Sequence, residues 1–374
     1  MNEKNKIVSL TSLRFFMMLS IVFSHFEFIK QFLNDNTYRA IHNPTLAVNF
    51  FFVLSGFGLM FSDIKRNPNN SNNLSIKNSI LFGINHIRRI YPLYLLITFL
   101  VFVIRLLIIL KKNCMINNLK ELVLQLFINI ILMQSLTGTS YFSQAFNGVS
   151  WFLSSIFIIY FFCPLFIFIL RNTVNNLRVA FVFLIINCFC IIILSHLFKW
   201  IQNNYLFISH PIDLLDYAFP GKRVFHVLQG MLICIIREKV FERLKKLSFS
   251  QFSSFEILIT LFIILYHFVR WLIINQDLVQ IIDIFLVVIL LFIFSFEGGL
   301  ISSILNNRYL IYLGNISMYL FLIHYPIRIY IVKVYDKIFN NNIGITILEM
   351  FSILILTFIF SILWEKTIKN FSNK

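Results

Sequence analysis

Long apolar runs constrain the fold of this chain more than any other feature. From Leu93 to Leu110 the only charged side chain is Arg105, and similar stretches recur along the sequence. A helix rises about 1.5 Å per residue, so about 20 mostly apolar residues cross the roughly 30 Å hydrocarbon core of a bilayer. A membrane barrel would instead show short segments of alternating polarity. The runs therefore predict transmembrane helices.

The composition of the 374 residues supports an all-α integral membrane protein. Hydrophobic residues make up 59% and charged residues 13% of the chain, whereas soluble domains carry about 25% charged residues. A soluble fold of this length could not bury so much apolar surface. We expect one membrane-embedded domain over 1–374, with no additional soluble domain. The cysteines show neither a disulfide framework nor a zinc spacing, so we expect no metal.

Eleven apolar runs are candidates for crossing the membrane, and the run 120–137 is the weakest because it contains several charged and amide side chains. We expect a polytopic bundle of about ten transmembrane helices, with 120–137 as a re-entrant or interfacial helix. The eleven runs lie near 8–29, 44–62, 90–110, 120–137, 152–170, 178–198, 222–236, 255–274, 280–296, 309–332 and 343–363.

Basic residues between the runs predict the orientation. The loops 63–89 and 237–246 and the tail after residue 365 are rich in Lys and Arg, which collect on the cytoplasmic side. This places both termini in the cytoplasm, in a multi-pass protein of the plasma (inner) membrane, and Asn67–Asn73 in a solvated loop. The net charge of +16 then indicates contact with the anionic headgroups of the lipid bilayer, and we expect no nucleic acid as partner.

Two ionisable residues of the first apolar run, Arg14 and His25, lie eleven positions apart. Eleven helical steps of about 100° return to within about 20° of the same face. Ionisable groups inside a bilayer are unfavourable and often functional. An arginine suits a phosphate or carboxylate, and a buried imidazole can accept a proton. The alternative is that Arg14 extends to the inner membrane surface and His25 only packs.

Five segments form an ordered series of motifs along the chain. They are Arg14 with His25 after ten residues, Asn49–Phe57 with FFVLSGF, Arg89–Tyr94 with RIYPLY, Trp151–Ser154 followed by Tyr160 and Pro164, and Leu313–Pro326 with LGNISMYLFLIHYP. Weaker matches are Arg223 with Phe225–Gly230, and Glu365-Lys366. In order and spacing the series resembles the acyltransferase-3 membrane family over nearly the whole chain.

This resemblance implies an O-acyltransferase. The family moves an acyl group, usually acetyl, from cytoplasmic acyl-CoA (acetyl-CoA) to a hydroxyl of a sugar or other acceptor. Acceptors commonly belong to surface polysaccharides or lipid-linked saccharides. By carry-over, His25 would be the general base or the transient acyl acceptor, and Arg14 would join it in the catalytic site.

The remaining motif residues receive binding roles from the same resemblance. Arg88 and Arg89 would bind the phosphates of coenzyme A. Ser55 would hydrogen-bond the thioester carbonyl, or else Ser55-Gly56 would serve close helix packing. For the substrate, Trp151 would stack on a sugar ring, or else belong to an interfacial aromatic belt. Ser317 and His324, seven residues apart on one helix face, would line the substrate path or only bond between helices.

Two departures from the family pattern keep another class open. The family often has arginines three and four positions before the one matching Arg89, where this chain has His86 and Asn85. It often has acidic residues five and six positions after the tryptophan, where this chain has Ile156 and Phe157. The missing acids favour a saccharide transporter or flippase, or a non-catalytic subunit of a glycan synthesis system. The Arg14 and His25 pair favours the enzyme. The sequence leaves the acceptor and the oligomeric state open.

Overall fold

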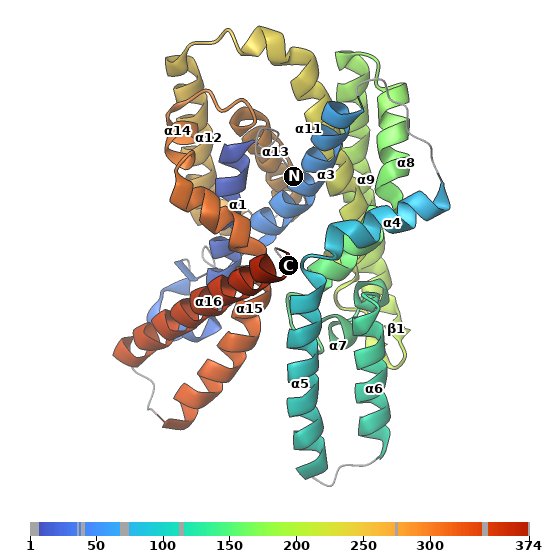
Figure 1. The fold of residues 1–374 in the computed structure, drawn as a ribbon, viewed down its shortest axis with the longest axis vertical. Helices are drawn as coiled ribbons and strands as arrows, with labels where there is room; N and C mark the ends of the chain where they lie inside the picture. Colours follow the sequence, from blue (N-terminus) through green and yellow to red (C-terminus); the bar gives the residue numbers. More distant parts are fainter. Residues whose placement is uncertain are drawn as a thin grey trace. The chain divides into compact units, whose positions relative to one another are not determined.

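The computed structural model describes residues 7–35, 37–38, 42–67, 75–111, 116–273, 276–338 and 343–372 (Figure 1). Within them the chain is almost entirely helical, which confirms the all-α membrane fold. Eight helices are long and apolar enough to cross a membrane: α3 (Thr45–Arg66), α5 (Tyr91–Lys111), α8 (Trp151–Thr173), α9 (Leu177–Asn204), α12 (Phe249–Val269), α13 (Gln276–Phe294), α15 (Arg308–Ile338) and α16 (Ile343–Ser372).

The other helices include both remaining candidates for the ten expected crossings. α1 (Val8–Ser24) is apolar but shorter, and α11 (Pro220–Leu244) lies outside the set of eight. The short elements are η2 (Glu27–Phe32), α4 (Ile76–Ile87), α6 (Ile116–Ile130), η3 (Gln134–Thr137), α7 (Ser140–Ser143), β1 (Leu206–Phe207), β2 (His210–Pro211), α10 (Leu215–Ala218), η4 (Arg270–Leu272) and α14 (Leu300–Leu305). The expected solvated loop 67–73 and both chain ends lie almost wholly outside the described residues.

The chain forms two compact units, which are described separately. Unit 1 comprises Met1–Leu74, Leu165–Ile192 and Val224–Ser317, and unit 2 comprises Ser75–Pro164, Ile193–Arg223 and Met318–Lys374. Residues of α8, α9, α11 and α15 therefore belong to both units.

Unit 1 is a helical bundle in which α3 packs on α13 and α1, and α12 packs on α13 and α14. Serine hydroxyls on α1 bond directly to backbone carbonyls of neighbouring segments. Ser9 Oγ donates to Phe294 O at 2.7 Å, and Ser12 Oγ donates to Leu305 O at 2.7 Å. Small polar residues of this kind let apolar helices approach closely and hold each other in the absence of water.

Three glycines in unit 1 mark points where helix backbones touch. A Cβ on Gly56 of α3 would lie 1.8 Å from Val227 O of α11, and a Cβ on Gly230 of α11 would lie 1.8 Å from Val53 O of α3. A Cβ on Gly314 of α15 would lie 1.9 Å from a carbonyl oxygen of α1. The packing alternative for the Ser55-Gly56 pair therefore has direct structural support at Gly56.

Buried ionic groups hold the rest of unit 1 together. The Glu256 carboxylate of α12 accepts from the Gly299 and Ser302 amides at 3.1 and 2.9 Å and from Ser302 Oγ, and so satisfies the free amides at the start of α14. Asp283 of α13, fully buried, accepts from Tyr266 Oη and Arg270 Nη2, both at 2.9 Å. These bonds tie each end of α12 to its neighbour.

The first helix ends earlier than the apolar run suggested. The expectation of a helix over 8–29 is wrong, because α1 stops at Ser24 and a 3₁₀ helix follows from Glu27. At the end of α1, Ser24 Oγ donates to Ile21 O at 2.7 Å and the His25 amide donates to Val22 O at 3.1 Å. Such i→i−3 bonds tighten the final turn and end the α-helix.

In unit 2, α6 is followed by a return stretch, residues 131–150, and both lie in the region expected to be re-entrant or interfacial. α5 and α6 run antiparallel side by side (Figure 1). Tyr94 Oη of α5 donates to Asn129 O at the end of α6 at 2.8 Å. The chain then turns at Leu132, whose φ of 56° is left-handed. It runs back beside α6, where Asn129 Nδ2 donates to Phe142 O at 3.1 Å. This path favours the re-entrant alternative.

Candidate active site

A pocket of about 340 Å³ in unit 2 lies at the position of the basic motif before α5. It is lined by Ile84, Ile87, Arg88, Tyr91, Ile130, Ile131, Leu132 and Phe157. α4, which the sequence analysis treated as loop, begins at an N-cap formed by Ser75, whose hydroxyl accepts from the Asn78 amide at 3.1 Å. The Arg88 guanidinium is thus the one charged group on an otherwise apolar and aromatic wall formed by described residues.

Arg89, the next residue, joins two of the sequence motifs. Its Nε donates to Tyr319 Oη at 3.0 Å, across 230 positions of the chain. Arg89 is exposed, whereas Tyr319 is 3% exposed. The buried phenol therefore fixes one edge of the guanidinium and leaves the charge open to solvent. The RIYPLY and LGNISMYL segments meet at this bond. Tyr319 lies within the fifth motif, and the sequence alone gave it no role of its own.

A buried polar network lies behind the wall of the pocket. Gln134 Nε2 donates to Tyr94 Oη at 3.2 Å, and Ser154 Oγ donates to Leu132 O at 2.7 Å. Ser135 and Ser154 share a hydroxyl contact at 2.8 Å. Gln134 and the two serines are completely buried. The network links α5, the return stretch and the start of α8, and so holds the pocket wall rigid.

The tryptophan of the fourth motif contributes to an aromatic and cationic cluster in unit 2. The rings of Trp151 and Tyr217 lie 4.8 Å apart, and the Arg223 guanidinium lies over both, at 5.7 and 5.1 Å from their centroids. Arg223 Nε also donates to Tyr217 O at 2.7 Å. Burial raises the pKa of the Tyr217 phenol, so this ring stays neutral beside the arginine.

Arg223 is buried at the centre of this cluster, with only 2% of its surface exposed. From the sequence it was noted only as a weak motif match. An arginine next to a long apolar run is itself a signal of function. Its neighbour Lys222 pairs with Asp216, so the beginning of α11 carries two buried cations, one of which is paired with a carboxylate.

His324 is completely buried on α15, and its Nδ1 lies 3.3 Å from Leu320 O, one turn earlier. The loop before Trp151 packs on the same part of α15. Asn147 Nδ2 donates to Leu322 O at 2.9 Å, and Gly148 lies against the Tyr325 ring. The segment that leads into the fourth motif therefore contacts the fifth motif, and the bond from Arg89 to Tyr319 connects the third motif to the fifth.

The predicted residues of unit 1 are placed on α1, α3 and the start of α15. Arg14 and His25 are both half-buried, and His25 follows the last residue of α1. His25 therefore lies just beyond the α-helix, and the spacing of eleven residues does not by itself place it on the same helix face as Arg14. Ser55 Oγ donates to Phe51 O at 2.8 Å, and Ser317 Oγ donates to Gly314 O at 2.8 Å. Both hydroxyl protons are used within their own helices, so each oxygen could only accept from a ligand.

Comparison with known proteins gives one match. The family profile of the acyltransferase-3 proteins, described as an acyltransferase domain, matches residues 7–365. No curated protein and no solved structure matches the chain. The match covers nearly the whole sequence, including every motif noted above. This chain therefore belongs to the acyltransferase-3 family of membrane acyltransferases.

Proposed function

We propose that this protein transfers an acyl group, in the simplest case acetyl, from cytoplasmic acyl-CoA to a hydroxyl of a surface polysaccharide or lipid-linked saccharide. The family membership carries the proposal, and the pocket at Arg88 supplies the supporting observation. On this proposal the protein lies in the plasma membrane with both termini in the cytoplasm.

The donor is assigned to the Arg88 pocket on chemical grounds. Coenzyme A joins several phosphates to a long, weakly polar pantetheine arm. Arg88 and Arg89 are exposed cations beside each other, which suits phosphates, and the pocket next to Arg88 is otherwise apolar and aromatic. Nε of Arg89 is bonded to Tyr319, and on this proposal the two terminal nitrogens of that guanidinium bind phosphate oxygens.

The acyl transfer is assigned to His25, with Arg14 as the charged group that orients the donor. The imidazole takes the proton from the acceptor hydroxyl, whose oxygen attacks the thioester carbonyl. The carbon–sulfur bond then breaks, and the coenzyme A thiolate takes the proton from the imidazolium. In the second variant of the proposal the imidazole accepts the acyl group first and passes it to the hydroxyl. Ser55 can take part only as an acceptor while its hydroxyl proton stays bonded to Phe51 O.

The acceptor is assigned to the aromatic cluster at Trp151 and to two buried polar residues of α15. Trp151 offers a ring face to a sugar, beside the Arg223 guanidinium. His324 and Ser317 lie on α15, which carries the acceptor path in this proposal. The competing function is passage of a saccharide across the membrane without chemistry, and Ile156 and Phe157 at the usual acidic positions are the observation in its favour.

The two functions are separated by incubating purified protein in nanodiscs with radiolabelled acetyl-CoA and candidate saccharides. Label on the saccharide supports the acyltransferase, and movement of unmodified saccharide without label transfer overturns it. Arg88→Gln should raise the KM for acetyl-CoA. Arg243→Gln is the matched control, since Arg243 is exposed on α11 and does not line the pocket. Equal effects of the two variants would remove Arg88 from the donor site.

A further inference from the structure

The pocket at Arg88 is too small to enclose a whole molecule of coenzyme A. Its volume of about 340 Å³ lies at the lower end of the range of about 300–1,000 Å³ for sites that hold a drug-sized ligand. Coenzyme A has two ends of different chemistry, a phosphorylated adenosine and a flexible pantetheine arm that carries the thioester. The apolar lining by itself suits either end, so the other groups of the pocket must decide which one it binds.

Two aromatic side chains line the pocket from different helices. Tyr91 belongs to α5 and Phe157 to α8, and both are half-buried, so each ring keeps accessible surface. Ile84, Ile87 and Ile131 add apolar surface to the lining. A nucleobase has two flat faces that stack on aromatic rings and pack against apolar side chains. These walls therefore suit a flat base.

The pocket offers few groups for hydrogen bonding, which disfavours the pantetheine arm. The amides and the hydroxyl of pantetheine would all need partners if they were buried. Tyr91 Oη already donates to Ile130 O at 2.8 Å, so its proton is not free for a ligand. A base instead buries its faces and turns its polar edge to the mouth of the pocket, where Ile84 is 47% exposed.

The turn that forms one wall has a conformation that leucine rarely adopts. Leu132 has a φ of 56°, in the left-handed region, and is 2% exposed. Its carbonyl accepts from Ser154 Oγ at 2.7 Å, and its amide donates to Asn129 O at 3.0 Å. Strained backbone held in this way concentrates at ligand sites, and it keeps the wall in one shape before a ligand arrives.

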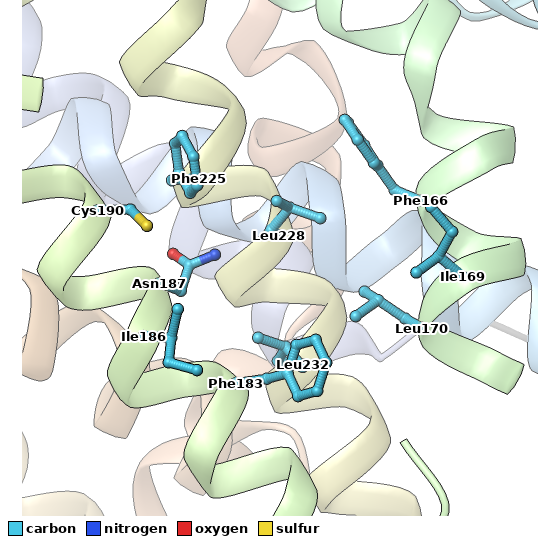
Figure 2. Close-up of a pocket in the computed structure, with 10 residues that line it drawn as sticks. All are labelled: Phe166, Ile169, Leu170, Phe183, Ile186, Asn187, Cys190, Phe225, Leu228 and Leu232. Atoms are coloured by element: carbon cyan, nitrogen blue, oxygen red, sulfur yellow. The ribbon is translucent and has the colours of Figure 1, made fainter. Parts of the chain in front are cut away.

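The cations beside the pocket select a nucleotide over a neutral aromatic ligand. Arg88 lines the pocket and Arg89 follows it, and both are exposed, so two guanidinium groups can meet phosphate oxygens. A groove of about 190 Å³ in unit 1, between α8, α9 and α11, gives the contrast (Figure 2). Its lining is aromatic and aliphatic apart from Asn187 and Cys190, and none of its lining residues carries a charge.

Resting on the proposed function, we infer that the Arg88 pocket binds the adenine of the acyl-CoA donor against Tyr91 and Phe157, with Arg88 and Arg89 at its phosphates. The class of donor follows from this site. An acyl group on a protein-bound phosphopantetheine has no adenosine and cannot fill the pocket. The protein therefore uses free acyl-CoA and discriminates against acyl carrier protein.

Binding is tested directly with adenosine 3′,5′-bisphosphate, which contains the nucleotide end and no thioester. The full chain in nanodiscs is photolabelled with the 8-azido derivative, and the labelled peptides are mapped by mass spectrometry. We expect saturable labelling of peptides that contain Tyr91 or Phe157, competition by acetyl-CoA but not by pantetheine, and no labelling of the groove segment 183–190. Equal labelling of both regions, or competition by pantetheine, would overturn the adenine site.

Two phenylalanines of α8 provide matched variants. Phe162 is 52% exposed and does not line the pocket, whereas Phe157 does. Phe157→Leu should weaken binding of the bisphosphate about three- to tenfold, because it removes the flat ring, and Phe162→Leu should leave it unchanged. Tyr91→Leu should weaken binding more than Tyr91→Phe, which keeps the ring. Equal affinities for Phe157→Leu and Phe162→Leu would contradict stacking at Phe157.

Label transfer separates a failure of the adenine site from a failure of the proposed function. Radiolabelled acetyl groups are offered on coenzyme A and on acyl carrier protein, with the same acceptor saccharides. Transfer at least about tenfold faster from acetyl-CoA supports the site. Equal transfer from both donors overturns the site and leaves the acyltransferase standing. Binding of the bisphosphate without transfer from either donor supports the site and contradicts the function.

Discussion

The contact between α3 and α11 gives the sharpest test of the fold. In Gly56→Ala the new methyl carbon would lie 1.8 Å from Val227 O. Close carbon–oxygen contacts between helices are normally about 3.3 Å or more, so the two backbones must separate by about 1.5 Å. A gap of 0.5–1 Å already removes about a quarter to a half of the dispersion energy between packed atoms. We therefore expect a destabilisation of at least about 3 kcal/mol.

The chain offers a matched control two positions away. Gly58 lies on the same helix, and a Cβ there meets no atom within 4 Å. Gly58→Ala should be neutral or stabilising by up to about 1 kcal/mol, because alanine is the better helix former. The assay is thermal unfolding in detergent with a thiol-reactive dye, since Cys163 and Cys234 are completely buried in the folded protein.

The two substitutions should move the melting temperature in opposite directions. With about 2–4 °C per kcal/mol for chains of 150–250 residues, Gly56→Ala should lower it by at least about 6 °C, and Gly58→Ala should leave it unchanged or raise it. Equal melting temperatures for the two variants would show that α3 and α11 do not touch at Gly56. The close-packing interpretation of this motif would then be refuted.

Three further predictions concern the site and its support. His25→Ala should reduce label transfer from acetyl-CoA by about 10² or more at unchanged melting temperature, and retained activity would remove His25 from the mechanism. Tyr319→Phe should raise the KM for acetyl-CoA about three- to tenfold and be non-additive with Arg89→Lys, whereas additive effects in the double mutant would show no coupling. Glu256→Ala should lower stability by about 3–5 kcal/mol in the same unfolding assay, because buried amides lose their acceptor, and a change below about 1 kcal/mol would contradict that role.

The helical class and the approximate positions of the long helices could be predicted from the sequence because they depend on local apolar content. The runs near 44–62 and 90–110 correspond to α3 and α5 within a few residues. The end of α1 could not be predicted in this way, since residues 25–29 remain apolar enough to continue a helix. A side-chain bond from Ser24 Oγ to Ile21 O and a backbone bond from the His25 amide to Val22 O end it instead. α4 was missed because it is an amphipathic helix of 12 residues, in which polar residues interrupt the apolar ones, so that no continuous apolar run marks it.

Candidate site residues could be proposed from the sequence where the residue type is itself the signal, whereas contacts between residues far apart in the chain could not. Arg88 and Arg89 were recognised as phosphate ligands from charge and position, and that role stays a prediction. The bond from Arg89 to Tyr319 joins residues 230 positions apart, so no local pattern could reveal it. Arg223 was likewise noted only as a weak motif match, because its contacts with the rings of Trp151 and Tyr217 cannot be read from the sequence.

The helix and return stretch at 116–150 has a consequence for how the protein is made. α6 has 15 residues and is not among the helices that could cross a bilayer unaided. Polar groups of α6 and of the stretch after it find partners on both sides in the sequence: Asn129 O accepts from Tyr94, and the Ser135 amide donates to Ser154 Oγ. While the ribosome is still synthesising α8, half of those partners do not exist. The segment therefore has to wait at the membrane surface, and enters the bilayer only after the following helix has been inserted.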